Sequence, residues 1–192
     1  MNIKCSLFSS AICLLAISPV FADAPAPQNL ITNGNFEQIK DGQAVGWSAT
    51  KVPDLIQSDF PEETNRGHFA EIELLKSGNK GAYFGQSVKV EPHSHYRLSL
   101  LARMNEGKIT IAVGGNKLSE RLLGQVHTRL TMFPLFWNED WSKYLVFNAN
   151  QWRPVNLEFD SGELTQVTVS FGAYFTKGVY SFDDVSLVKV EN

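Results

Sequence analysis

The sequence predicts an all-β protein, an antiparallel β-sandwich. Three observations predict this class: apolar and polar residues alternate over several short segments, turn-forming residues separate those segments, and no helical segments are interleaved between the strands. The chain has 192 residues, of which 43% are hydrophobic and 19% are charged, and this is the composition of a globular domain. A chain of this length is expected to fold as one domain around one core.

The first element is a leader rather than part of the fold. Lys4 precedes an apolar run over residues 7–17, and the small-residue ending Val20-Phe21-Ala22 follows it. This order is that of a secretory signal peptide, with cleavage expected after Ala22. Residues 1–22 are therefore assigned to the signal peptide, 23–28 to a Pro- and Ala-rich linker, and 29–192 to the domain. The protein is expected to be secreted or periplasmic.

The cysteines and the charge exclude several functions. Cys5 and Cys13 both lie in the leader, so an exported chain would have no disulfide, no cysteine nucleophile and no thiolate zinc site. The formal net charge of −3 offers no basic surface for nucleic acid or an anionic membrane. No apolar run is long enough for a membrane span.

The remaining elements follow in order as half-buried strands. Alternation is clearest over residues 96–102, 109–113, 155–159 and 167–175, and turn residues lie between these segments. One region differs: residues 116–124 allow a short helix, and residues 125–132 then alternate again as a strand.

Several segments, in this order, resemble a known family. They are Asn29-Leu30-Ile31-Thr32-Asn33-Gly34-Asn35-Phe36-Glu37 with Gly46-Trp47, then Gln86-Ser87-Val88, Tyr96-Arg97-Leu98-Ser99, Trp152 before 155–159, and Ser181-Phe182-Asp183-Asp184-Val185-Ser186-Leu187. The chain resembles, over about residues 29–190, the jelly-roll carbohydrate-binding modules of the galactose-binding-domain-like superfamily. The resemblance implies a jelly-roll sandwich in which Trp47 and Trp152 occupy core positions. It is weakest over residues 116–150.

The resemblance also implies a structural calcium ion. In the family, an N-terminal Glu and a C-terminal Asp lie side by side and help to bind calcium, so the expected metal residues are Asn35, Glu37, Asp183 and Asp184. Calcium requires six to eight oxygen ligands, which carboxylates and carbonyls supply. Strand alternation predicts that Asp183 points inward with Val185 and that Asp184 points outward. The alternative is that Glu37 and Asp183 only accept backbone hydrogen bonds.

No catalytic constellation is recognised. The sequence has no Gly-x-Ser-x-Gly elbow and no phosphate-binding glycine loop. His93 and His95 could hold a metal, but a turn with two histidines and no third ligand nearby is better read as surface. The acidic residues are scattered, and since the separation of a glycosidase carboxylate pair is spatial, hydrolysis stays a weak alternative.

Aromatic residues gather between residues 133 and 152. Sugar rings stack on the faces of Trp and Tyr while polar side chains bind the hydroxyls, so Trp137 and Trp141 are candidate ligand-binding residues. Tyr144, Arg103 and Tyr174 are candidate secondary contacts on the outward faces of their strands. The competing interpretation is that the large aromatics of this region belong to the core.

The sequence therefore predicts an exported module that binds carbohydrate or glycan without chemically changing it. The alternative is a secreted structural or adhesion protein that contacts another protein or the cell envelope. A glycoside hydrolase on the same scaffold is the weaker alternative.

Overall fold

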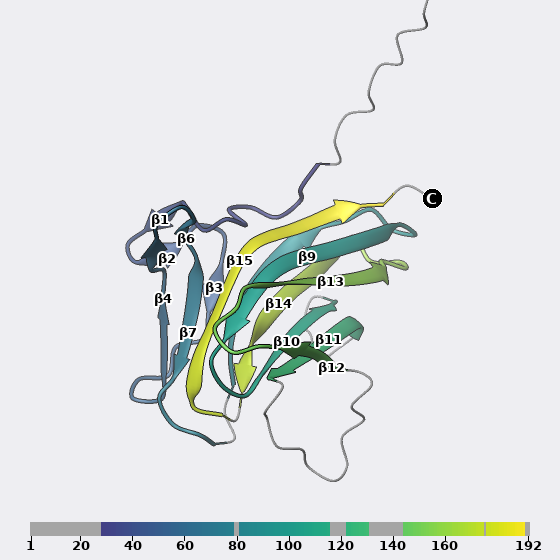
Figure 1. Ribbon diagram of the computed structural model, residues 1–192. Helices are drawn as coiled ribbons and strands as arrows, with labels where there is room; N and C mark the ends of the chain where they lie inside the picture. The colour runs from purple at the N-terminus through teal and green to yellow at the C-terminus, as the bar shows by residue number, and fades with distance from the viewer. Residues whose placement is uncertain (1–27, 79–80, 116–121, 131–143, 175, 191–192) are drawn as a thin grey trace, which may run out of the picture.

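A computed structural model describes residues 28–78, 81–115, 122–130, 144–174 and 176–190. Every regular element within these ranges is a β-strand, and the strands form two sheets that pack face to face as a sandwich (Figure 1). The predicted all-β jelly-roll class is confirmed. In the same ranges the chain forms no helix that is long and apolar enough to cross a membrane.

The two main sheets contain six and five strands. The six-stranded sheet has the order β12 (Tyr144–Phe147), β11 (Leu122–Leu130), β10 (Lys108–Gly114), β14 (Gln166–Tyr174), β8 (Gly81–Lys89) and β3 (Ser48–Ala49). The five-stranded sheet has the order β13 (Arg153–Asp160), β9 (His95–Met104), β15 (Gly178–Lys189), β7 (Ala70–Leu74) and β4 (Ile56–Asp59). Neighbouring strands are antiparallel except β11 and β12.

Two small hairpins complete the described part of the chain. One pairs β1 (Ile39–Lys40) with β2 (Gln43–Ala44), and the other pairs β5 (Glu62–Glu63) with β6 (Gly67–His68). The turn of the second hairpin contacts the outer face of the five-stranded sheet through Arg66, which bonds to Asp183.

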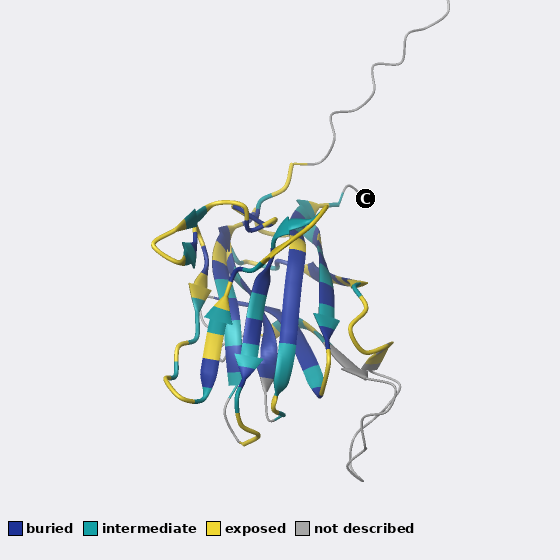
Figure 2. Ribbon diagram, turned by 60° about the vertical axis from the view of Figure 1, so that its left-hand side comes forward, coloured by how far each residue is buried: buried dark blue, intermediate teal, exposed yellow. Residues whose placement is uncertain are grey.

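The predicted strands correspond to β9, β10, β13 and β14. Their apolar alternating positions are buried because successive side chains of a strand point to opposite faces, and Figure 2 shows the resulting banding along the strands. Of the region 116–124, in which the sequence allows a short helix, residues 122–124 belong to β11. Residues 116–121 lie outside the described residues, as do 131 and 132 of the predicted second strand.

The core between the sheets is built around aromatic rings. Phe36 is fully buried, and its ring centroid lies 5.4 Å from that of Trp47 and 6.4 Å from those of Phe84 and Phe171. The indole Nε1–H of Trp47 donates to the backbone oxygen of Asn33 at 3.0 Å, which satisfies its one buried polar atom. The predicted core position of Trp47 is confirmed.

A β-bulge in the middle of β15 corrects one prediction. Asp184 has a positive φ of 51°, and the pairing of β15 with β9 shifts between Asp183 and Ser186. An extra residue in one strand reverses the alternation beyond it. Phe182 and Val185 are therefore both buried in the core, and Asp183, between them, does not point inward with Val185 as predicted. The outward position of Asp184 is confirmed by the 60% exposure of its side chain.

Candidate functional site

The outer face of the six-stranded sheet carries a row of residues that crosses five strands. The strand register pairs these residues in the order Tyr83, Gly172, Thr110, His127 and Tyr144. Cross-strand partners lie on the same face of a sheet. Their neighbours Phe84, Phe171 and Ile111 are buried in the core, so the row belongs to the face that points away from it.

A second row beside the first has small or polar side chains. It contains the register partners Ser48, Gly85, Ser170, Ala112 and Gln125. Although they lie on the outer face, Ser170 and Ala112 are only 4% and 5% exposed. The middle of this face, here called the floor, is therefore formed by small side chains that are shielded from solvent.

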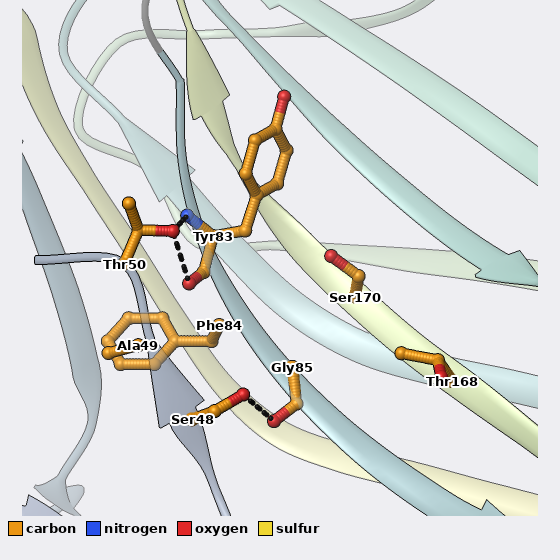
Figure 3. A pocket seen from close by; sticks show the side chains of 8 residues that line it. All are labelled: Ser48, Ala49, Thr50, Tyr83, Phe84, Gly85, Thr168 and Ser170. Carbon is orange, nitrogen blue, oxygen red and sulfur yellow. Dashed lines mark hydrogen bonds between the residues drawn. The ribbon is translucent and has the colours of Figure 1, made fainter. Parts of the chain in front are cut away.

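A pocket opens where this floor meets β3. It has a volume of about 270 Å³ and is lined by Ser48, Ala49, Thr50, Tyr83, Phe84, Gly85, Thr168 and Ser170 (Figure 3). A Cβ atom at Gly85 would meet only Ser48 Oγ, at 3.4 Å, and the Val169 oxygen. A side chain at position 85 would therefore occupy open space above the sheet, and glycine is not required there to avoid a clash.

Tyr83 provides the aromatic surface of the pocket. A Cβ atom at Gly172 would lie 2.8 Å from Tyr83 Cδ1, so the ring lies against this glycine on the neighbouring strand. The backbone of Tyr83 is fixed by Thr50, whose Oγ1 accepts from the Tyr83 N–H at 3.1 Å and donates to the Tyr83 oxygen at 3.3 Å (Figure 3). The Thr50 N–H also donates to this oxygen, at 2.9 Å. Backbone and ring are both held in place before any ligand arrives.

The chemistry of this pocket suits a hydroxyl-rich ring. A tyrosine face attracts the C–H groups of a flat ligand, while hydroxyl groups accept and donate hydrogen bonds. Ser48, Thr50, Thr168 and Ser170 each contribute a hydroxyl group to the pocket lining (Figure 3). None of the described residues that line the pocket has a charged side chain.

One region of the outer face of the five-stranded sheet is covered by the β5–β6 hairpin. Arg66, in the turn of the β5–β6 hairpin, reaches Asp183 Oδ2 with its Nη1 at 2.8 Å. The guanidinium carbons of Arg66 and Arg103 lie 4.4 and 4.5 Å from the centroid of the Trp152 ring. Arg103 also forms an ion pair with Glu63 at 3.4 Å. Little of this region is left for a ligand.

Two predicted roles change in this cluster. Trp152 is half-buried beneath the two guanidinium groups and against Phe69, so its predicted core position is wrong. Cation–π stacking, rather than the interior of the sandwich, shields its ring from water. Arg103 lies on the five-stranded sheet, whereas Tyr144 and Tyr174 belong to the six-stranded sheet, so the structure does not bring these three predicted ligand contacts together.

The other predicted ligand residues are only partly described. Trp137 and Trp141 lie outside the described residues. The backbones of Tyr144 and Tyr174 belong to β12 and β14, but the structure does not describe their side chains. Tyr83 was missed, although the alternation of Gly81, Tyr83 and Gly85 is the signal that would have placed an aromatic ring between two open positions.

The four predicted metal residues make different contacts. Asn35 and Asp184 both line a polar cavity of about 440 Å³ between the N-terminal segment and β15. Glu37 instead accepts the backbone N–H of His68 at 3.0 Å, and Asp183 is bonded to Arg66. Asp183 also accepts a backbone hydrogen bond, from the Asp184 N–H at 2.8 Å, so both carboxylates make the contacts that the alternative expects.

In the part of the chain that the structure describes, no group of three or more His, Cys, Asp or Glu side chains could hold a metal ion. The guanidinium of Arg66 supplies positive charge 2.8 Å from Asp183 and 3.7 Å from Asp184. Calcium binding stays a prediction.

Burial shifts the pKa of two carboxyl groups on the five-stranded sheet, Asp183 and Glu71. Burial raises the pKa of Asp183, while the hydrogen bond from Arg66 opposes the shift. Burial likewise raises the pKa of Glu71, whose carboxylate accepts a hydrogen bond from Ser181 at 3.1 Å. A buried carboxylate is costly unless it is paired, so both groups depend on these partners.

The contacts of His95, on β9 of the same sheet, should make the free energy of unfolding depend on pH. His95 Nδ1 lies 2.8 Å from Asp160 and its Nε2 lies 3.5 Å from Glu158, and these hydrogen bonds raise the pKa of His95 above 6.5. A raised histidine pKa stabilises the fold below the unfolded value, and this contribution is lost as the pH rises through the folded value.

We therefore expect His95→Gln to be less stable than the wild type at pH values below the raised pKa of His95. The difference should disappear at higher pH. Urea unfolding at a series of pH values checks this, with Asp160→Asn as the variant that removes the main cause of the shift. A stability difference that stays constant with pH would contradict the assignment.

Comparisons with known proteins support the fold. No family model matches the chain, and no curated protein matches its sequence. Most of the similar solved structures are carbohydrate-binding modules. One described as "CBM4 structure and function" has a TM-score of 0.61 at 15% identity, covering 83% of this chain and 99% of that one.

Two other structures are similar at comparable levels. TmCBM61 in complex with β-1,4-galactotriose has a TM-score of 0.53 at 18% identity and covers 85% of this chain and 99% of that one. The enzymatically active domain of tailspike protein 4 from bacteriophage CBA120 has a TM-score of 0.59 at 13% identity, with 84% of this chain covered. This chain spans only 21% of that domain. The chain has the jelly-roll fold of these modules.

Proposed function

We propose that the protein is an exported, non-catalytic carbohydrate-binding module whose ligand lies on the outer face of the six-stranded sheet. The observation on which the proposal rests is the ring of Tyr83, held against Gly172 beside a pocket lined with hydroxyl groups. Similar structures described as carbohydrate-binding modules support the proposal, and one of them is a complex with a galactose trisaccharide.

Each part of the pocket has a role in this proposal. Tyr83 stacks on the C–H face of a sugar ring, and Gly85 leaves the depth that the ring needs. Ser48, Thr50 and Thr168 lie where hydroxyl groups of the sugar would meet them. The preformed pocket lowers the entropy cost of binding, because the protein groups are ordered beforehand.

Replacement of Tyr83 tests the proposal. We expect Tyr83→Ala to weaken glycan binding roughly 2- to 10-fold, since aromatic stacking contributes about 0.5–1.5 kcal/mol, while Tyr83→Phe retains most of the affinity. A glycan array on residues 23–192 identifies the ligand, and calorimetry with that ligand gives the affinities. Thermal unfolding shows whether each variant is folded.

A matched pair at Gly85 tests the pocket separately from the ring. Gly85→Ala should be tolerated because its Cβ would make an ordinary contact, whereas Gly85→Leu should fill the pocket and block the ligand. Unchanged binding by folded Tyr83→Ala and Gly85→Leu would contradict the proposed site. Capture of a protein partner with no glycan binding would support the adhesion alternative instead.

A further inference from the structure

We infer that Ser170 determines which sugar ring the pocket accepts, by forming a hydrogen bond with one ligand hydroxyl at the floor; the inference rests on the proposed function. Ser170 is only 4% exposed, and it lines the pocket together with Tyr83 (Figure 3). In the part of the chain that the structure describes, the Ser170 hydroxyl forms no hydrogen bond. The pocket therefore contains a buried polar group that has no protein partner.

Two other serine side chains that are buried in the described ranges do have partners. Ser161 is fully buried, and its hydroxyl donates to the backbone oxygen of Glu91 at 2.8 Å. Ser181 is 2% exposed and donates to the Glu71 carboxylate at 3.1 Å. A buried hydroxyl without a partner costs free energy, because it gives up its hydrogen bonds to water. Ser170 departs from this pattern, and such departures are expected at functional sites.

The neighbours of Ser170 on the sheet leave its hydroxyl to a ligand. Its register partners are Gly85 on β8 and Ala112 on β10, and neither has a side chain that can form a hydrogen bond. Beyond Gly85 lies Ser48 on β3, so the backbones of Ser48 and Ser170 are two strands, or roughly 10 Å, apart. A Cβ atom at Gly85 would meet only Ser48 Oγ and the Val169 oxygen. One sugar ring above Gly85 could therefore reach Ser48 with one edge and Ser170 with the other.

The two serines make different demands on that ring. Ser48 Oγ donates to the Gly85 oxygen at 2.9 Å, so toward a ligand it acts as an acceptor. The Ser170 hydroxyl can donate and accept, and a sugar hydroxyl matches both abilities. A ring without a hydroxyl at this edge would leave Ser170 unpaired, and a site built in this way rejects such a ring.

Substitution of Ser170 separates a ligand contact from a structural role. We expect Ser170→Ala to bind glycan roughly 2- to 10-fold more weakly, since it loses one hydrogen bond to the ligand. The urea midpoint of the free protein should stay equal or rise, because the variant removes an unpaired buried hydroxyl. Ser161→Ala is the matched control: its hydroxyl is paired and lies outside the pocket lining, so its midpoint should fall while its affinity is unchanged.

Calorimetry on residues 23–192 gives the affinities. The probes are β-1,4-galactotriose, cellotriose and xylotriose, together with any oligosaccharide that the array identifies. Monodeoxy analogues of the bound probe then identify the hydroxyl that Ser170 contacts. One analogue should bind the wild type as weakly as the parent sugar binds Ser170→Ala, and it should bind Ser170→Ala with no further loss.

Three outcomes separate the inference from the proposed function. Unchanged affinity in Ser170→Ala with Tyr83 still required would overturn the inference and leave the proposed function standing. A loss of affinity that no deoxy analogue reproduces would do the same, since it would show that Ser170 acts through the fold or through a water molecule. Failure to bind any glycan would overturn the proposed function, and the inference with it.

Discussion

Arg66→Met is expected to lower the free energy of unfolding by about 2–4 kcal/mol, below the top of the range for breaking a buried ion pair because Arg66 is 24% exposed. The variant leaves the Asp183 carboxylate, only 3% exposed, without its cationic partner. It also removes the guanidinium that lies over Trp152. Both losses weaken the attachment of the β5–β6 hairpin to the sheet.

The pH dependence of this variant distinguishes charge from packing. Burial already raises the pKa of Asp183, and loss of Arg66 should raise it further. An acid whose pKa is raised in the folded state costs stability above that pKa, and the cost disappears as the pH falls through it. The deficit of Arg66→Met should therefore shrink at acidic pH, as measured by denaturant unfolding.

Arg97→Met is the matched control, because Arg97 forms a 2.8 Å pair with Glu158 in which both side chains are about half exposed. It should cost less than about 1 kcal/mol. An Arg66 variant no less stable than this control would contradict the role of the buried pair.

The same unfolding assay on the wild type tests calcium binding, since an ion bound only by the folded state would add about 2.7 kcal/mol to the free energy of unfolding at about 100 times its Kd.

Phe36→Ala is expected to be the most destabilising single change, at about 3–5 kcal/mol, since it opens a cavity at the centre of the core. Phe36 is fully buried and contacts the rings of Trp47, Phe60, Phe84 and Phe171. It has a positive φ of 56°, so the N-terminal segment adopts an unfavourable backbone conformation in order to place this ring in the core.

Phe36→Leu is the control that keeps most of the buried volume, and it should cost roughly 1–2 kcal/mol. Urea denaturation gives the free energies for both variants. Equal and small losses in both would show that the core closes around residue 36 without the ring, contrary to the packing seen in the structure.

The sandwich was predictable because the signal for a strand is local. Tyr96, Leu98, Leu100 and Ala102 alternate along β9, and all four are buried. Alternation fails where one residue is added: the bulge at Asp184 reverses the faces, and no local pattern marks it.

The site was less predictable because it depends on pairing between distant segments. Arg66 and Asp183 are 117 residues apart in the sequence. The ion pair between them therefore could not be predicted from the residues around either one. Tyr83 is a candidate binding residue because its ring lies against Gly172, its register partner on β14. This pairing cannot be predicted from the local sequence. Trp152 was assigned to the core from the family resemblance, whereas two arginines and Phe69 shield it near the surface.

Residue-level mapping of a bound glycan tests the central claim most directly. The measurement is a two-dimensional NMR titration of residues 23–192 with the oligosaccharide that binds most tightly on an array. The account predicts that the largest amide shifts occur at Tyr83, Gly85, Thr168 and Ser170, on β8 and β14 of the six-stranded sheet. Shifts confined to Arg66, Arg103 and Trp152 on the opposite face would contradict it.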